Sequence, residues 1–103
     1  MMVRKHLTLF ELLVHSPDIQ RQALLKTLTD TQSKAVAEAI YNVLKGTCHI
    51  SDKDKKNLNR YKSVIRRLVS SELTQKQRHR LLIKYRHLLP SLLKPVIEMF
   101  KSK

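Results

Sequence analysis

Lysine and arginine recur every four residues in one short stretch of this sequence, at Lys76, Arg80 and Lys84. On an α-helix, side chains four positions apart stack on one face, so these three cations would form a ladder. Like charges at that spacing repel one another unless an anion neutralises them. Cations that displace condensed counterions from a phosphate backbone gain free energy without reading base sequence. The spacing therefore predicts a phosphate-binding face.

A second group of cations lies on the polar side of a helix predicted over residues 52–70. Over residues 53–87, 12 Lys and Arg residues stand against 2 acidic residues, an imbalance that favours a polyanionic partner over a merely solvated surface. The residues predicted to contact nucleic acid, mainly through phosphates, are Lys55, Lys56, Arg60, Arg66, Arg67, Lys76, Arg80 and Lys84. The apolar residues predicted to position them from the core are Leu58, Ile65, Leu81 and Leu88.

Direct reading of base edges has less support in the sequence. The arginines that would reach guanine edges from a helix in a major groove are Arg66, Arg67, Arg78 and Arg80. A helix-turn-helix centred on residues 70–74 would place them there, but the turn lacks the usual glycine. Tyr61 and Tyr85 fall on apolar faces, where core packing explains them better than base stacking.

No constellation typical of an active site or a metal centre is present. The five histidines and the single cysteine lack ligand spacing, and the adjacent Cys48 and His49 make at most half a site. The acidic residues mostly fall at helix starts or on polar faces, where capping and the helix dipole explain them. We therefore predict no enzyme, no catalytic residue, no metal and no cofactor. A lone cysteine forms no internal disulfide, which favours an intracellular location.

Helices must position these cations. The 103 residues include 1 glycine and 3 prolines and are 42% hydrophobic, which favours helix over sheet and suffices for one modest core. We expect an all-α fold, a compact bundle of five or six short helices in a single domain over residues 1–103. Near-neutral helices would occupy residues 1–46, strongly basic helices residues 51–89, and an apolar segment with prolines residues 90–103.

Apolar residues at helical spacing predict helices over residues 4–15, 17–28, 32–44, 52–70, 74–89 and 91–100. Ser16 is the predicted cap of the second helix, with Pro17 at its first position. The apolar side of that helix is predicted to be Ile19, Ala23, Leu24 and Leu28.

The other helix ends also carry local signals. Gly46 is predicted to adopt a left-handed conformation that ends the third helix. Ser51 and Thr74 each stand three positions before a side chain that completes a capping box. Pro90 is predicted to end the fifth helix, and Pro95 to kink the last helix or to delay its start.

The charge distribution indicates a class of partner, and two alternatives remain. Residues 51–103 hold 15 of the 21 Lys and Arg residues, which favours nucleic acid, the commonest polyanion. An assembly protein would instead dock an acidic protein on its basic face and self-associate through its apolar tail. A membrane-active tail would use Leu92, Ile97 and Phe100. No apolar stretch approaches the ~20 residues that span a bilayer, so a membrane is not expected.

Four stretches carry a resemblance to a known family. They are RKHL to LL at residues 4–13, NVLKG at 42–46, the basic helix around 55–67, and LLPSLLKPV at 88–96. Together they resemble small basic proteins of Polinton/Maverick-type DNA elements and the related adinto-like viruses.

The family has a Pro-x-Leu-Leu-x-Pro motif, matched here from Pro90 to Pro95, and usually a preceding glycine pair, which this chain replaces with His87 and Leu88. The resemblance implies a virus-like or element-derived origin and the binding or compaction of genomic DNA inside a particle or a nucleus. It therefore favours DNA over RNA, and a nuclear or virion-associated location.

Overall fold

The computed structural model describes residues 5–46 and 50–101, and every regular element among them is helical. In chain order these elements are α2 (Leu7–His15), α3 (Asp18–Lys26), α4 (Asp30–Leu44), α5 (Asp52–Asn59), α6 (Lys62–Leu68), α7 (Gln75–Lys84), the 3₁₀ turn η1 (Arg86–Leu88) and α8 (Leu89–Lys101). The predicted all-α fold is confirmed. The described residues form seven α-helices where five or six were expected, because one predicted helix is divided.

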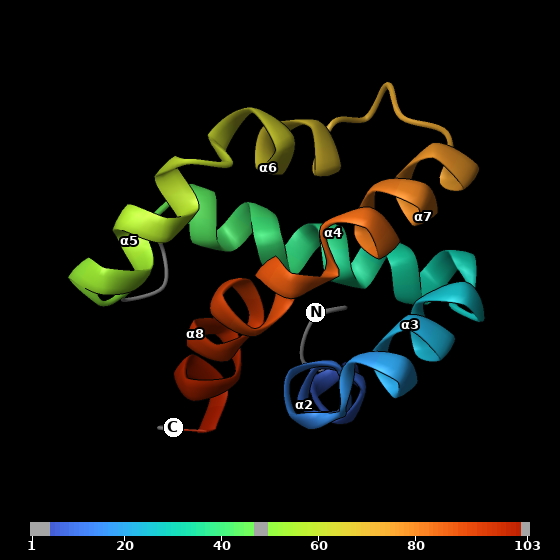
Figure 1. The fold of residues 1–103 in the computed structure, drawn as a ribbon, viewed down its shortest axis with the longest axis horizontal. Coiled ribbons are helices and arrows are strands. Elements are labelled where there is room, and N and C mark those ends of the chain that lie inside the picture. Colours follow the sequence, from blue (N-terminus) through green and yellow to red (C-terminus); the bar gives the residue numbers. More distant parts are fainter. Residues whose placement is uncertain (1–4, 47–49, 102–103) are drawn as a thin grey trace.

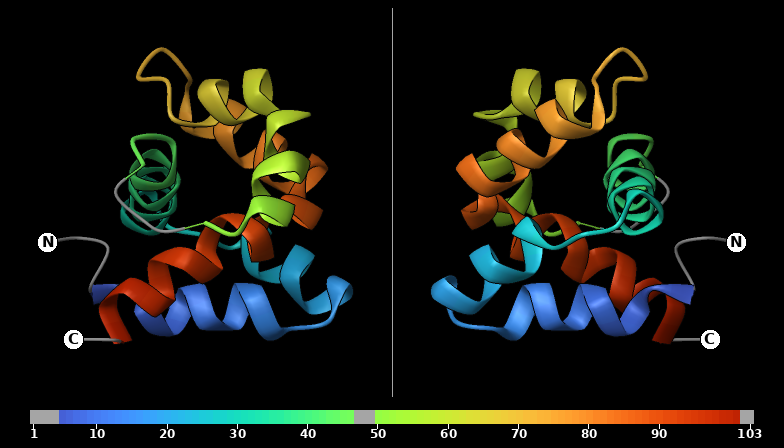
Figure 2. Two further views of the ribbon diagram at one scale, coloured as in Figure 1. Left: turned by 90° about the vertical axis from the view of Figure 1, so that its left-hand side faces the viewer. Right: turned by 90° about the vertical axis from the view of Figure 1, so that its right-hand side faces the viewer.

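Helix α4 is the longest α-helix and crosses the molecule (Figure 1). In that view α5, α6 and α7 run as an arc from the left over the top to the right, and α2 and α8 lie beneath. Two further views show the same separation of the arc from α2 (Figure 2). The radius of gyration is 12.5 Å, close to the ~13 Å of a folded domain of 100 residues. The bundle is therefore compact, as predicted.

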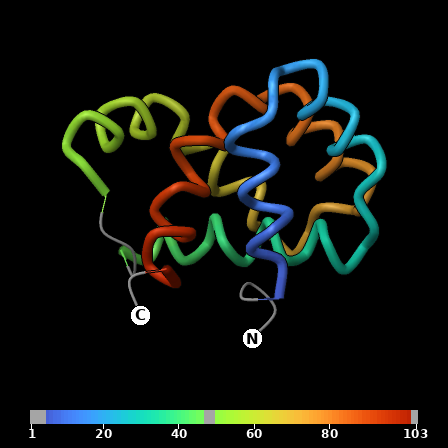
Figure 3. The backbone as a smooth tube through the Cα atoms, turned by 90° about the horizontal axis from the view of Figure 1, so that it is seen from below, coloured from blue at the N-terminus to red at the C-terminus, as the bar shows by residue number. Residues whose placement is uncertain are grey.

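Helix α8 lies in the centre of the packing. It packs against both α2 and α4, and Figure 3 shows α2 and α8 next to each other when the molecule is seen from below. The residues that α8 buries are Leu89, Leu92, Leu93, Pro95, Val96 and Ile97. The C-terminal apolar segment is therefore core through Ile97, and the alternative in which Leu92 and Ile97 form an exposed tail is wrong.

Pro90 does not end a helix as predicted, and Pro95 does not delay the start of the last helix. Helix α7 already ends at Lys84, and Pro90 instead occupies the second position of α8. Its missing N–H is harmless there, since the first turn of a helix has no partner for that group. Pro95 lies inside α8, which neither starts late nor stops there. The burial of the apolar face offsets the lost backbone hydrogen bond.

The helix predicted over residues 52–70 is divided into α5 and α6. Arg60 and Tyr61 separate the two, and the Tyr61 N–H donates to the Leu58 carbonyl at 3.0 Å in a tighter turn. An unbroken helix of that length would extend about 28 Å, nearly the 31 Å of the longest extent of the molecule. The break lets α5 pack against α8 and α6 against α4, burying Leu58 and Ile65 at two different places.

Capping residues set the helix starts. Thr74 and Gln77 form the predicted reciprocal capping box of α7, and the Ser51 hydroxyl accepts the Asp54 N–H at 3.2 Å. Thr29 and Gln32 form a second reciprocal capping box, which was not predicted. Helix α4 therefore begins at Asp30 rather than near residue 32. These starts depend on contacts three residues apart, which is why sequence signals locate most of them.

Helix α3 is rotated relative to the prediction. Its N-cap is Pro17, without a side-chain cap, so Ser16 is not the predicted capping residue. Ile19 is 82% exposed and Ala23 is exposed, whereas Leu25 is fully buried, so the predicted apolar side is wrong for Ile19 and Ala23. Its other members, Leu24 and Leu28, do pack in the core as predicted. The reason lies in Arg21, which shares a helical stripe with Leu25.

Arg21 binds the end of α2. Its Nε donates to the Leu13 carbonyl at 2.6 Å, and its Nη2 donates to the Val14 and Ser16 carbonyls at 3.2 Å each. These carbonyls lie at the C-terminus of α2, where the last carbonyls lack helical partners. Satisfying them requires Arg21 to face α2, and Leu25, four residues later, then faces the core.

Gly46 has φ +76°, as predicted, and its N–H donates to the Val43 carbonyl at 3.1 Å. A Cβ at this position would meet no atom within 4 Å, so only the backbone conformation disfavours a side chain. We predict that Gly46→Ala lowers the free energy of unfolding by about 1 kcal/mol, and that Gly46→Asn lowers it less, because Asn tolerates the left-handed region. Urea titration of both variants tests this, and equal losses would contradict it.

Candidate nucleic-acid interface

The predicted contact residues all lie on the arc of α5, α6 and α7 or at its break. Each has an exposed side chain, and none of these side chains forms a hydrogen bond or an ion pair with another described residue. They are Lys55 and Lys56 on α5, Arg60 at its end, Arg66 and Arg67 on α6, and Lys76, Arg80 and Lys84 on α7. Exposed cations without acidic neighbours keep their full charge available to a partner.

The three residues of the ladder lie on α7 as predicted, although this helix is shorter than the one predicted over residues 74–89. Thr74 caps the start of the helix, Lys76 and Arg80 lie about one helical turn apart, and Lys84 is the last residue of the helix. Each step of four residues rises about 6 Å. The opposite side of α7 is anchored by Leu82, which is 1% exposed. His87, three positions after Lys84, lies in η1 beyond the end of α7 and does not extend the ladder.

The cations of α5 and α6 do not share one straight face. The chain turns at Arg60 and Tyr61. The 100° spacing of one continuous helix therefore does not predict how Lys55 and Lys56 on α5 are oriented relative to Arg66 and Arg67 on α6. The predicted two-sided helix is therefore wrong as a single element. The arc of three short helices visible in Figure 1 replaces it.

Of the core residues predicted to position these cations, Leu58, Ile65 and Leu88 are buried. Leu81 is only partly buried, and Leu82 takes the fully buried place on α7. The shift by one residue is within the angular tolerance of an apolar face.

Arg78 does not belong with the exposed cations. Its Nε donates to the Leu68 carbonyl at 3.2 Å and its Nη2 to the Ser70 carbonyl at 3.1 Å. It thereby holds the C-terminal end of α6 against α7 and is not a free candidate for base contact. Arg78 is the fourth residue of α7, as Arg21 is of α3. That shared position after a turn is the sequence signal that would have identified both.

Arg86 also serves the fold. Its Nε and Nη2 bind the two carboxylate oxygens of Asp18 at 2.8 and 3.0 Å, and its Nη1 donates to the Ile83 carbonyl at 2.8 Å. This bidentate pair joins η1 to the start of α3 across 68 positions of sequence. The second ion pair within residues 5–46 and 50–101 joins Lys101 to Glu11 at 3.3 Å. Both pairs use acidic residues of the near-neutral half.

Three aromatic rings cluster where the break between α5 and α6 meets the end of α7. The ring centroid of Tyr61 lies 6.2 Å from that of Tyr85 and 5.5 Å from that of His87, in edge-on arrangements. Both tyrosines are partly buried against the core, which confirms the prediction that they pack rather than stand free. The Lys84 ammonium lies 5.5 Å from the Tyr85 ring, a cation–π distance.

Among residues 5–46 and 50–101, no three histidine, cysteine, aspartate or glutamate side chains gather in a way that would hold a metal ion. The possible half-site at Cys48 and His49 lies outside the described residues. No described helix is long and apolar enough to cross a bilayer.

Comparisons of the chain with models of protein families, with curated protein sequences and with solved structures find no match.

We predict that Arg78→Gln destabilises the fold without weakening nucleic-acid binding. Losing its two hydrogen bonds to backbone carbonyls lowers the free energy of unfolding by roughly 1–2 kcal/mol. Arg80→Gln is the matched control on the same helix, with an expected stability change within about 0.5 kcal/mol. Urea titration measures stability, and equal losses in the two variants would contradict the assignment.

The Asp18–Arg86 pair predicts a pH dependence. The hydrogen bonds from Arg86 hold the pKa of the Asp18 carboxyl below its ordinary value of 3.8. A carboxyl with a lowered pKa in the folded state stabilises the fold above its unfolded pKa, and this contribution is lost as the pH falls through the folded value.

Wild type should therefore exceed Asp18→Asn in urea midpoint at neutral pH, and the difference should vanish once the pH falls below the Asp18 pKa. Asp18 also lies in the first turn of α3, where a carboxylate interacts with the helix dipole. Asp30→Asn, in the first turn of α4, is the control for that effect. A difference no larger than that of Asp30→Asn at neutral pH would refute the contribution of the pair.

Proposed function

We propose that this chain is a non-enzymatic nucleic-acid-binding protein that contacts phosphates through the arc of α5, α6 and α7. The observation that supports the proposal is the separation of roles among the cations. Arg21, Arg78 and Arg86 satisfy groups of the fold, whereas the eight arc cations contact no acidic group among the described residues.

The physical gain comes from counterion release. A polyanion with condensed counterions loses them when cations bind, and the affinity then falls steeply with salt concentration. If all eight arc cations contact a duplex, the slope of log affinity against log salt is about −7. Such contacts carry no sequence information, so binding is sequence-tolerant.

The biological setting is part of the same proposal. The resemblance to proteins of Polinton/Maverick-type elements favours DNA over RNA, and a role in compacting or packaging genomic DNA in a nucleus or virion. A folded domain of this size with a cationic arc suits that role, because many copies would neutralise a long duplex without needing defined sites.

The alternative is an assembly module that docks an acidic protein on the same arc. This alternative also required an exposed apolar tail for self-association, and Leu92 and Ile97 of that tail are buried. Its remaining support is the charge of the arc, which nucleic acid satisfies equally well.

We predict that substituting Lys76, Arg80 and Lys84 together by Gln reduces the slope of log affinity against log salt by about 2.7, since each lost phosphate contact removes about 0.9. The measurement is fluorescence anisotropy with unrelated duplexes of equal length over a range of salt concentrations. Wild type should bind all of them alike.

The control removes the same charge elsewhere, by substituting Lys5, Lys26 and Lys94 by Gln. These side chains are exposed and lie outside the arc, so the slope should change little. No binding at ~50 mM salt, or no effect of the arc substitutions, would overturn the proposal and leave the protein partner as the leading hypothesis.

A further inference from the structure

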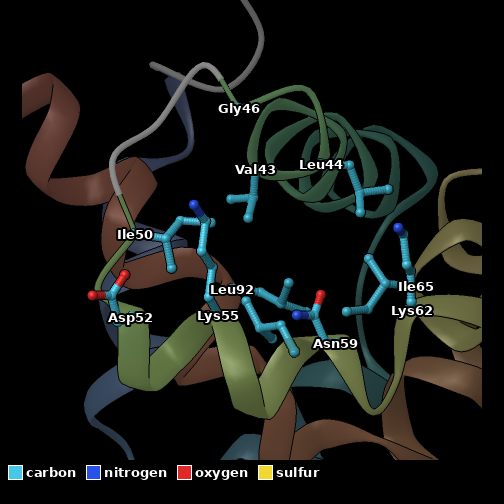
Figure 4. A pocket seen from close by; sticks show the side chains of 11 residues that line it. Val43, Leu44, Gly46, Ile50, Asp52, Lys55, Asn59, Lys62, Ile65 and Leu92 are labelled. Atoms are coloured by element: carbon cyan, nitrogen blue, oxygen red, sulfur yellow. The ribbon is translucent and has the colours of Figure 1, made fainter.

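A cavity of about 460 Å³ opens between the C-terminal end of α4 and the helices α5 and α6. Figure 4 shows the side chains that line it. Small-molecule sites in proteins span roughly 300–1,000 Å³, so this space is large enough for a ligand with a short chain. It exists because α5 packs mainly through Leu58 and leaves its other side apart from α4.

The inner wall of this cavity is aliphatic. Val43 comes from α4, Ile65 from α6, Leu58 from α5 and Leu92 from α8. All four are at least nine-tenths buried, and the more exposed Leu44 and Ile50 add to the aliphatic lining that a ligand would cover. Among the described residues, no aromatic ring lines the cavity, which makes their lining a poor stacking site for a nucleobase and a suitable one for an alkyl chain.

The rim of the cavity is cationic. Lys55, Asn59 and Lys62 follow one another at intervals of four and three residues and point into the space (Figure 4). None of the three side chains forms a hydrogen bond or an ion pair with another described residue. Asp52 also lines the cavity, but it lies at the far end from Lys62, beside Ile50 (Figure 4). An anionic head therefore fits best at the Lys62 end.

We propose that this cavity binds an aliphatic carboxylate, with its alkyl chain against the aliphatic wall and its carboxylate at the Lys62 end. The Asn59 amide donates a hydrogen bond to the same carboxylate. Burial of the chain provides affinity that grows with its length. The Lys62 ammonium selects a negative head, and Lys55 adds positive potential from the opposite end. This site is distinct from the α7 ladder, although Lys55 belongs to both the cavity and the arc.

The test is a titration with decanoate followed by calorimetry and by chemical-shift changes in NMR spectra. Saturable binding of one decanoate per chain is expected, with an affinity at least tenfold above that of hexanoate and that of decanol. That is, both probes should bind tenfold more weakly, because hexanoate lacks four methylene groups and decanol lacks the charge.

The variant Lys55→Gln with Lys62→Gln should weaken decanoate binding at least tenfold. Its matched control is Lys53→Gln with Lys56→Gln, which removes the same charge from exposed positions of α5 that do not line the cavity. Equal effects of the two double variants, or no saturable binding of decanoate, would overturn the proposal.

A binding experiment with phosphatidylglycerol vesicles distinguishes a site for a free carboxylic acid from a site for a membrane lipid. If the vesicles bind in a manner that needs Lys55 and Lys62 while free decanoate does not bind, the free-acid site is refuted and the partner is a membrane lipid. None of these outcomes decides the nucleic-acid proposal, because the slope test substitutes α7, which does not line the cavity.

Discussion

The burial of α8 against α2 and α4 is the interaction on which the rest of the structure depends. Leu92, Leu93 and Val96 are completely buried; the two leucines lie between Pro90 and Pro95, and Val96 follows Pro95. These contacts join the C-terminal end of the chain to its near-neutral N-terminal half. The low-charge helices therefore form the core with α8, and the cationic helices are left as an arc on the outside.

That arrangement resolves the conflict between a high net charge and a compact fold. With a net charge of +13, the cationic side chains repel one another in the compact state. Some arginines are instead used inside the fold, where Arg21 and Arg78 bind helix carbonyls and Arg86 binds Asp18. The planar guanidinium donates several hydrogen bonds at once, which a lysine ammonium does in a less defined geometry. The remaining cations stay exposed for a partner.

The break between α5 and α6 connects the two proposed sites. It bends the arc that carries the candidate phosphate contacts, and it allows Leu58 and Ile65 to reach different parts of the core. The same bend leaves α5 separated from α4 by the lined cavity. Lys55 faces that cavity while Lys56, the next residue, does not line it, so neighbouring cations on α5 serve different surfaces.

The sequence by itself determined what depends on contacts a few residues apart. The capping box of Thr74, the cap at Ser51 and the left-handed Gly46 were all predictable, as were the all-α fold and the exposure of the α7 ladder. Only the tertiary structure decided the rotation of α3, the division at Arg60 and the Asp18–Arg86 pair. Those features join groups far apart in the chain, and local periodicity carries no information about which distant helix a side chain will meet.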